Sequence, residues 1–350
     1  MIQRTMKAAY LPGNSTVVLK EVDTPDPGHG EVLIQMKAST ICGSDIRAIY
    51  HEHIGEGAEA YQNKIAGHEP CGKIVKTGSG ARRFKEGDRV VVYHISGCGI
   101  CYDCRRGFMI NCTGNSRAAY GWQRDGGMAE YLLAEEKDLC HLPDELSYID
   151  GAQVACGFGT VYEGLERIGI SGNDDVLITG LGPVGLATAM LCRALGANRI
   201  FGIDITQERL DIAKNKGLCD EVLIADPSNV SEIYSKTGGN GVEKAVDCSG
   251  NGEARLSTIK ATRKWGKIVF IGEGEKCSFN PSPDIIHDQK TIFGSWVTSI
   301  WKMEELLEHI VRWGIRPEEL VTHRFEIDQT PEAFDLMSKG KCGKVAICFN

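Results

Sequence analysis

The sequence predicts an α/β protein with a β-rich first part and a second part built on a doubly wound parallel sheet. Its 350 residues are enough for about two domains at ~150 residues each. In the first 150 residues, glycine-containing turns separate short β runs such as "EVLIQMKA" and "DRVVVY", as in a barrel. From about 155 to 293, runs that read as buried strands alternate with helical segments, which is typical of a parallel sheet covered by helices.

Composition and charge argue against several classes of protein. A net charge of −8 without a basic stripe disfavours nucleic acid or an anionic membrane as a partner. The N-terminal segment "MIQRTMKAAY" lacks the apolar core of a signal peptide, and no run approaches the ~18 apolar residues of a membrane span. We therefore expect a cytoplasmic enzyme whose 14 cysteines do not form a disulfide framework.

Four of these cysteines lie close together in the stretch "GCGICYDCRRGFMINC". Cys98, Cys101, Cys104 and Cys112 have the spacing C-x2-C-x2-C-x7-C, in which overlapping C-x2-C turns bring the sulfurs to one ion. Four thiolates complete the tetrahedral coordination of Zn²⁺ and leave no open position, so we predict a structural zinc. An iron–sulfur cluster is the competing metal, because it uses similar cysteine spacings, and cysteines without a metal are the third interpretation.

A second set of metal-ligand side chains is spread over three segments. Cys42 lies in "TICGSDIRAIY", His68 in "IAGHEPCGKIV" and Cys156 in "QVACGFGTVYEG". Two thiolates and an imidazole would hold a catalytic zinc and leave the fourth position for a substrate oxygen, with Asp45 as the carboxylate that orients His68. Taken singly, each of the three also fits an ordinary buried side chain, so the interpretation depends on the surrounding motifs.

The segment "DVLITGLGPVGLATAMLCRALGA" predicts a nucleotide-binding turn. A β run from Asp175 to Thr179 enters Gly180, Gly182 and Gly185 in the pattern G-x-G-x-x-G, and a helical stretch follows. The glycines permit a tight turn, the close approach of a pyrophosphate and the packing of helix on strand. The N–H groups at the start of the helix then face the anion.

A second apolar run, "RIFGID", ends in Asp204, nineteen residues after Gly185. A carboxylate at that point accepts hydrogen bonds from ribose hydroxyls and repels a 2′-phosphate, which favours NAD over NADP. Arg209, five residues later, would hold the adenosine ribose or be a solvated helix charge.

The order of these motifs resembles that of the zinc-dependent medium-chain alcohol/polyol dehydrogenase family, of the sorbitol and threonine dehydrogenase kind. Cys-Gly-Ser-Asp (42–45), Gly-His-Glu-x-x-Gly (67–72), Gly-Asp-Arg-Val (87–90), the four-cysteine lobe and Gly-Leu-Gly-Pro-Val-Gly (180–185) span essentially the whole chain. The resemblance implies a GroES-like catalytic domain of residues 1–154 and 294–350, split around a Rossmann NAD-binding domain of residues 155–293. It also implies two Zn²⁺ per chain and a homo-oligomer, either a dimer or a tetramer.

The reaction implied by the resemblance is reversible hydride transfer between an alcohol and NAD. Zinc held by Cys42, His68 and Cys156, a set taken from the resemblance, would lower the pKa of the substrate hydroxyl. Ser44 would accept the hydroxyl proton, and the nicotinamide would accept the hydride.

The resemblance also places residues at the cofactor. Thr160 is expected under the nicotinamide, and Pro183 and Val184 are expected beside the phosphates together with the glycines. Lys344, a looser match, is expected near the pyrophosphate.

The chain departs from the family pattern near the zinc. The stretch "ACGFGT" around Cys156 resembles the alcohol dehydrogenase version rather than a glutamate-containing one. Glu69 is expected beside the zinc, with transient coordination as an alternative. In the family, the proton is relayed from the serine through the cofactor ribose toward solvent, often by a final histidine. Arg47 stands where that histidine is common, and arginine does not act as a base. His51, His53 or direct transfer from the ribose to water are the alternatives for the end of the relay.

The substrate is predicted from the segments that flank the zinc motifs. The segment 51–62 would form the lip of the pocket, and Trp122, Trp296 and Trp301 are candidates for its walls. Arg117 and Arg124, with Arg47, would suit an anionic substrate. A polyol or sugar-derived secondary alcohol is the first choice, a polyol phosphate or hydroxy acid the second, and an amino alcohol such as threonine the third.

Proteins of other classes remain as alternatives. A nucleic-acid-binding zinc module conflicts with the net charge of −8. A zinc-free reductase on the same fold would lack the ligands that this chain has. A catalytically inactive relative used as a scaffold is the third alternative, although every expected catalytic group is present.

Overall fold

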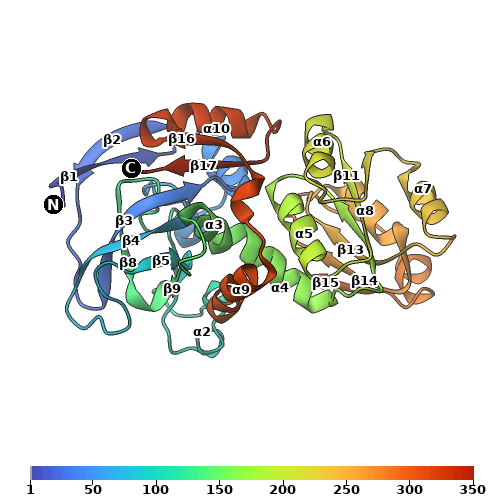
Figure 1. Ribbon diagram of the computed structural model, residues 1–350, viewed down its shortest axis with the longest axis horizontal. Helices are drawn as coiled ribbons and strands as arrows, with labels where there is room; N and C mark the ends of the chain where they lie inside the picture. Colours follow the sequence, from blue (N-terminus) through green and yellow to red (C-terminus); the bar gives the residue numbers. More distant parts are fainter. Residues whose placement is uncertain (1) are drawn as a thin grey trace. The chain divides into compact units, whose positions relative to one another are not determined.

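The computed structural model describes residues 2–350, apart from the side chain of Ala58. These residues form two compact units (Figure 1). One comprises residues 2–159, Thr298–Lys339 and Lys344–Asn350, and the other comprises Thr160–Val297 and Gly340–Gly343. The chain therefore leaves the first unit twice, for the long segment Thr160–Val297 and for the short segment Gly340–Gly343, and returns to it each time.

A mixed sheet forms the centre of the first unit. Within residues 2–350 it has seven strands in the order β16-β17-β3-β4-β5-β9, with β8 paired to β3. Val32, Ile34 and Met36 of β3 share one buried cluster with Val90 and Val92 of β5, because alternate residues of a strand face the same side. The strands are β3 (Glu31–Thr40), β4 (Pro70–Thr77), β5 (Arg89–Val92), β8 (Tyr131–Glu135), β9 (Leu139–His141), β16 (Val321–Glu326) and β17 (Lys344–Cys348).

The register of this sheet brings three distant segments together. β3 and β4 are antiparallel, and Ser39 near the end of β3 lies opposite Pro70 at the start of β4. β17 is antiparallel to β3, with Ala346 opposite Thr40. The end of β3, the start of β4 and the start of β17 therefore lie side by side (Figure 1).

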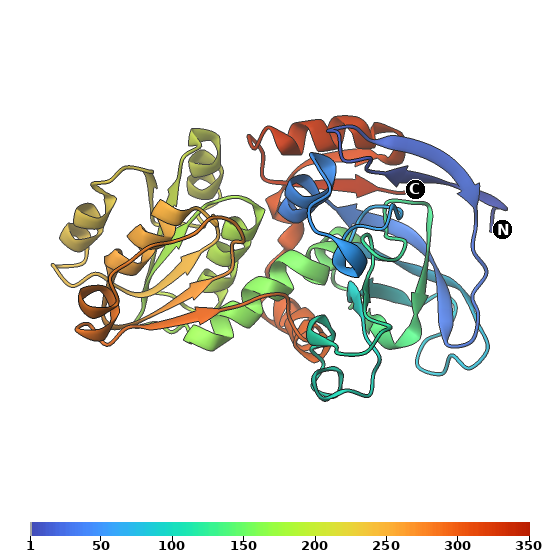
Figure 2. The ribbon, with the colours of Figure 1, turned by 180° about the vertical axis from the view of Figure 1, so that it is seen from behind.

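Smaller elements surround this sheet. The cap of helix α3 is a reciprocal pair, in which Ser147 and Asp150 each bond the other's backbone. Helix α9 ends at Gly314, whose φ of 66° is left-handed. The ribbon from behind shows α9 beside the lobe that carries α2 (Figure 2). The elements are β1 (Thr5–Tyr10), β2 (Val18–Asp23), β6 (Ile95–Ser96), β7 (Ala118–Ala119), α1 (Gly43–Asp45), α2 (Tyr102–Arg105), α3 (Tyr148–Gln153), α9 (Ile300–Trp313) and α10 (Thr330–Ser338).

The second unit is built on a parallel sheet. Its described strands follow the order β12-β11-β10-β13-β14-β15. From β10 the chain adds strands first on one side of the sheet and then on the other. This is the order of a doubly wound dinucleotide-binding sheet. The strands are β10 (Asp175–Thr179), β11 (Arg199–Asp204), β12 (Glu221–Ile224), β13 (Val242–Asp247), β14 (Thr262–Phe270) and β15 (Thr291–Gly294). The predicted combination of a β-rich part with a doubly wound parallel part is confirmed.

Helices cover this parallel sheet. Helix α5 packs on β10 and β11, α6 on β11 and β12, and α8 on β10, β13 and β14. None of the helices in the described part of the chain combines the length and apolar character needed to cross a lipid bilayer. The helices are α4 (Gly159–Ile168), α5 (Pro183–Ala194), α6 (Gln207–Asn215), α7 (Asn229–Lys236) and α8 (Gly252–Ala261). Single-turn π- and 3₁₀-helices lie at Ile46–Tyr50, Gly57–Glu59, Met109–Asn111, Glu136–Asp138, Val154–Phe158, Ser282–Ile286, Pro317–Leu320 and Ile327–Gln329.

Candidate functional site

The four clustered cysteines converge around helix α2. The sulfurs of Cys98, Cys101, Cys104 and Cys112 all lie within 4.8 Å of one another. A Cβ at Gly97 would lie 2.6 Å from Cys104 Sγ, so only glycine fits beside the cluster. Four convergent sulfurs fit a closed tetrahedral zinc.

Backbone N–H groups donate hydrogen bonds to these sulfurs. The amide of Cys101 points to Cys98 Sγ at 3.3 Å, and that of Cys98 points to Cys112 Sγ at 3.3 Å. Hydrogen bonds from the amides of Cys104 and Thr113 lower the pKa of Cys101 to about 6. Thiolates are the form that binds metal, so the lowered pKa of Cys101 favours a cation there, whereas burial raises the pKa of Cys104 to about 12.

The second candidate metal centre follows from the pairing of β3 with β4. Cys42 lies just beyond the end of β3, and His68 and Glu69 directly precede β4, so the antiparallel register brings them together. Cys156 joins them from the π-helix Val154–Phe158. One ligand atom from each of Cys42, His68, Glu69 and Cys156 lies within 4.8 Å of the others. The structure thus brings together the three ligands that the sequence suggested for a catalytic zinc, with Glu69 beside them.

One carboxylate holds two of these side chains. Asp45 Oδ1 lies 2.8 Å from His68 Nδ1, and Asp45 Oδ2 accepts a hydrogen bond from the backbone N–H of Cys42 at 2.9 Å. Because Nδ1 donates to Asp45, the lone pair of Nε2 is directed toward the cysteines. The hydrogen bond from the Cys156 thiol lowers the pKa of Cys42, and the same hydrogen bond raises the pKa of Cys156, so Cys42 is the more acidic of the two thiols.

Glu69 differs from the other three because it has a buried cationic partner. Lys344 Nζ lies 2.5 Å from Glu69 Oε2, and the hydroxyl of Thr40 donates to the same oxygen. Glu69 Oε1 has no hydrogen-bond partner among the described residues. We predicted Lys344 near the pyrophosphate, and its contact with Glu69 was missed. A lysine in the apolar run "GKVAIC" was the available signal, since a buried lysine needs a carboxylate.

The predicted proton-transfer residues differ in burial and in their hydrogen-bond partners. Ser44 is partly buried, and its Oγ lies 3.5 Å from His68 Nε2, so it borders the ligand set. Arg47 is exposed. His51 contacts the hydroxyl of Ser15 at 2.9 Å, and His53 contacts a backbone carbonyl at 2.8 Å.

The predicted substrate arginines already have partners. Arg117 forms an ion pair with Glu59 at 2.5 Å, and Arg124 forms one with Glu135 at 2.7 Å. Trp122 lies with its ring centroid 6.4 Å from that of His68, so it is close to the candidate zinc.

The other two tryptophans lie elsewhere in their units. Trp296 is largely exposed in the second unit. Trp301 packs on the cysteine lobe, because a Cβ at Gly107 would lie 2.9 Å from its ring. The assignment of Trp296 and Trp301 to the pocket wall stays a prediction.

The glycine turn of the second unit has the predicted strand-turn-helix form. Gly180 has a φ of +86°, and a Cβ at Gly185 would lie 1.8 Å from the Gly180 carbonyl oxygen, so both positions require glycine. Helix α5 starts with Pro183 after Gly182 as N-cap, so its first turn leaves N–H groups without an intrahelical acceptor.

Acidic and basic side chains lie beside this turn. Asp204, at the end of β11, accepts hydrogen bonds from the backbone N–H of Leu181 at 2.6 Å and from that of Thr206 at 2.8 Å. Arg209 Nη1 lies 3.7 Å from Asp204 Oδ2, and Arg209 Nε has no hydrogen-bond partner among the described residues. Thr160 lies in this unit near the start of α4. Pro183 and Val184 form the first turn of α5.

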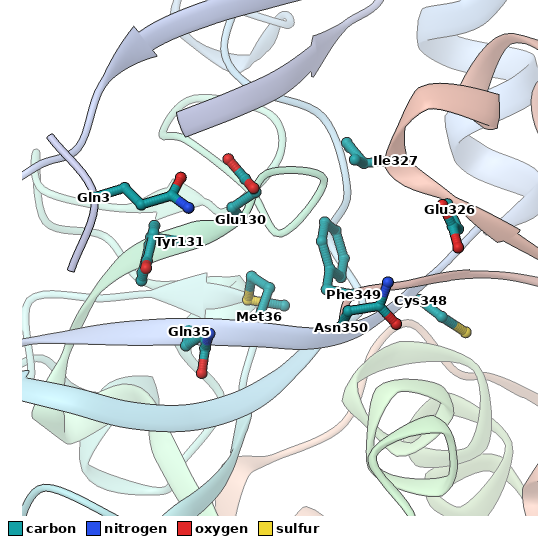
Figure 3. Close-up of a pocket in the computed structure, with 10 residues that line it drawn as sticks. All are labelled: Gln3, Gln35, Met36, Glu130, Tyr131, Glu326, Ile327, Cys348, Phe349 and Asn350. Carbon is teal, nitrogen blue, oxygen red and sulfur yellow. The ribbon is translucent and has the colours of Figure 1, made fainter. Parts of the chain in front are cut away.

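A separate pocket in the first unit lies apart from both cysteine clusters. It has a volume of about 300 Å³ (Figure 3). No candidate metal ligand contributes to its wall, so we do not assign the chemistry to it. It is lined by Gln3, Gln35, Met36, Glu130, Tyr131, Glu326, Ile327, Cys348, Phe349 and Asn350.

Comparison with known proteins agrees with the two-part architecture. Residues 28–144 match the family model of the alcohol dehydrogenase GroES-like domain, and residues 183–312 match that of zinc-binding dehydrogenases. The uncharacterized zinc-type alcohol dehydrogenase-like protein YphC of Escherichia coli is 54% identical over 350 residues, which cover 99% of each chain. The chain belongs to the zinc-dependent medium-chain dehydrogenase family. The family predicted from the order of motifs is thus confirmed.

Other members of this family are more distant. L-threonine 3-dehydrogenase of a Shewanella species is 30% identical over 351 residues, covering 99% of this chain and 100% of the relative. The structure of an alcohol dehydrogenase from Escherichia coli in complex with NADH has a TM-score of 0.88 at 25% identity, with 99% and 100% of the chains covered. That of 2R,3R-butanediol dehydrogenase from Bacillus subtilis has a TM-score of 0.84 at 27% identity, with the same coverage.

Proposed function

We propose that this chain is a zinc-dependent dehydrogenase that transfers a hydride reversibly between a polyol, or a sugar-derived secondary alcohol, and NAD. The convergence of Cys42, His68 and Cys156, with their ligand atoms within 4.8 Å, is the observation that carries the proposal. Two thiolates and one imidazole are a donor set that suits a catalytic zinc.

The metal and the residues around this ligand set would have different roles in the reaction. Zinc bound there would act as a Lewis acid that eases removal of the substrate's hydroxyl proton. Asp45 fixes the ring of His68 and the backbone of Cys42 through its two oxygens. Ser44 Oγ, 3.5 Å from His68 Nε2, borders the ligands and is the proposed first acceptor of that proton.

The cofactor proposal rests on the second unit. Gly180 and Gly185 permit the tight turn, Gly182 keeps the backbone open to a pyrophosphate at the start of α5, and Asp204 would receive the ribose hydroxyls of NAD. Arg209 lies beside the turn, its Nε has no hydrogen-bond partner among the described residues, and it is the proposed contact to the adenosine ribose. Thr160 under the nicotinamide stays part of the proposal.

The ion pairs of Arg117 and Arg124 favour an uncharged substrate. Arg117 and Arg124 are paired with Glu59 and Glu135, so their charges are already compensated. This argues against a polyol phosphate or a hydroxy acid. An amino alcohol such as threonine is the second candidate, because threonine dehydrogenases are 30% identical over nearly the whole chain.

Several further expectations belong to the same proposal. Cys98, Cys101, Cys104 and Cys112 would bind a structural zinc that braces their lobe. Residues 1–154 and 294–350 would act as the catalytic domain and residues 155–293 as the NAD-binding domain. A cytoplasmic location and a dimeric or tetrameric assembly stay predictions.

The test is NADH formation from NAD by the purified protein with a panel of polyols, polyol phosphates, hydroxy acids and threonine. We expect turnover with the polyols that is much faster than with the phosphates. Turnover confined to threonine would replace the substrate class with the second candidate. No turnover with any alcohol, by protein that contains two zinc ions per chain, would refute the proposed function.

A further inference from the structure

His94 lies between two of the candidate zinc ligands without being one of them. It lies between β5 and β6, directly before Ile95, and it is 5% exposed. Its Nδ1 lies 2.7 Å from the carbonyl oxygen of Ala155, the residue before Cys156. Its ring centroid lies 5.3 Å from that of His68. One side chain therefore contacts both the Cys156 segment and the His68 ring.

The partner atom fixes which nitrogen carries hydrogen. A carbonyl oxygen only accepts, so His94 must present Nδ1–H to Ala155. This hydrogen bond restrains the peptide that leads into Cys156. A donor at this point is chemically specific, because a ring of the same size without an N–H would pack there but would not donate to the Ala155 carbonyl.

The backbone of His94 is itself anchored. Its carbonyl oxygen accepts a hydrogen bond from the backbone N–H of Tyr120 at 2.8 Å. The hydroxyl of Tyr120 donates to Asp138 Oδ2 at 2.9 Å, and the hydroxyl of the neighbouring Tyr93 donates to the Thr298 carbonyl at 2.6 Å. These hydrogen bonds restrain the backbone that carries the imidazole.

We propose that His94 is a positioning residue that holds Cys156 at the distance from His68 that one zinc requires. This inference rests on the proposed function, because it assumes zinc at Cys42, His68 and Cys156. Asp45 restrains the Cys42 and His68 segments through its two oxygens. Cys156 comes from a π-helix outside the sheet, and the His94 bond supplies the corresponding restraint there.

The test compares metal binding in three variants. His94→Phe keeps an aromatic ring and removes the donor. His94→Asn keeps an N–H one bond beyond Cγ, where Nδ1 lies, and His94→Gln moves the N–H to the position of Nε2. Zinc affinity is measured by competition with a chromophoric chelator, and the cobalt-substituted proteins are compared by their thiolate-to-metal absorption bands.

We expect wild-type protein to hold two zinc ions. His94→Phe should keep the zinc of the cysteine lobe and bind the second about 10–100-fold more weakly, as for other residues that orient metal ligands. Its cobalt band should shift, because the Cys156 sulfur is displaced. His94→Asn should bind the second zinc more tightly than His94→Gln, and this pair decides the matter if His94→Phe does not fold.

Two results would overturn the inference. If His94→Phe bound the second metal with wild-type affinity and an unchanged cobalt spectrum, or if the Asn and Gln variants bound it equally, His94 would not position Cys156. A wild-type protein that binds only the lobe zinc would overturn the proposed catalytic centre itself, and this inference with it.

Discussion

The ammonium of Lys344 lies 2.5 Å from the carboxylate of Glu69, and both side chains are almost completely buried beside the candidate zinc ligands. The pairing of β17 with β3 produces this contact, because it brings Val345 into hydrogen-bonding distance of Ile41, one residue from Cys42. A buried carboxylate with one cationic partner depends strongly on that partner.

Replacing Lys344 by methionine should therefore destabilise the protein. The change leaves the Glu69 carboxylate buried without its cation, which typically costs about 3–5 kcal/mol of unfolding free energy. Denaturant unfolding of wild type and variant measures the loss. The double variant Lys344→Met/Glu69→Gln should recover a large part of it, because a neutral amide needs no counterion. Equal loss in the single and double variants would show that the pair is not energetically coupled.

The two cysteine clusters should respond differently to single substitutions. Cys101→Ser should lose one zinc and much of the stability, because a closed structural zinc contributes directly to folding. Cys42→Ser should keep the fold and lose at least ~100-fold in turnover, because a Lewis acid supplies several kcal/mol to the transition state. Metal analysis, thermal unfolding and NADH formation are measured on both. Full activity in Cys42→Ser would contradict the catalytic assignment.

Asp138 predicts a pH dependence of stability. Burial raises the pKa of this carboxyl to about 7 from 3.8. Between these values the native state keeps a proton that the unfolded state has released, so stability falls as pH rises. Its contribution is complete below about pH 4 and is lost through about pH 7, with a slope of up to about 1.4 kcal/mol per pH unit.

Asp138→Asn should remove this slope, because an amide has no proton to lose in that range. Unfolding free energies measured from pH 4 to pH 8 check the expectation. Asp144→Asn is the control, because the side chain of Asp144 is 98% exposed. Parallel profiles for wild type and Asp138→Asn would mean that Asp138 is not the source of the slope.

The structure also shows why some of the site was predictable from the sequence. The turn from Gly180 to Gly185 could be located because its signals are local, with an apolar run before the glycines and a helical pattern after them. The clustering of Cys98 to Cys112 is local in the same way. The meeting of Cys42 with His68 could be expected only from the order of family motifs, since it depends on the register of β3 against β4.

Contacts made by distant segments were not predictable. Lys344 reaches Glu69 through the pairing of β17 with β3, and His94 reaches Ala155 through packing of a π-helix on the sheet. The lysine in the apolar run "GKVAIC" signals that Lys344 needs a carboxylate, but the sequence does not identify Glu69 as that carboxylate or Ala155 as the partner of His94. The arginines show the same limit, because Arg117 and Arg124 suggested an anionic substrate, but the fold supplies Glu59 and Glu135 as their partners.

Cofactor preference should depend on Asp204. Its carboxylate is held at the end of β11 by the N–H groups of Leu181 and Thr206, where it would repel the 2′-phosphate of NADP. Asp204→Asn keeps hydrogen-bond acceptance and removes the charge. The ratio of kcat/KM for NAD to that for NADP should fall by at least ~10-fold, which corresponds to about 1.4 kcal/mol. Asp211→Asn, an exposed change on the next helix, should leave the ratio unchanged.

The most direct measurement of the central claim is the return of activity to metal-depleted protein as zinc is added back. NADH formation from a polyol and NAD is followed together with zinc content, in wild type and in Cys42→Ser. We predict that activity rises only as the second zinc per chain is bound, and that Cys42→Ser stays inactive at any zinc concentration. Full turnover by wild-type protein that holds only one zinc, or none, would contradict the claim that Cys42, His68 and Cys156 hold a catalytic metal.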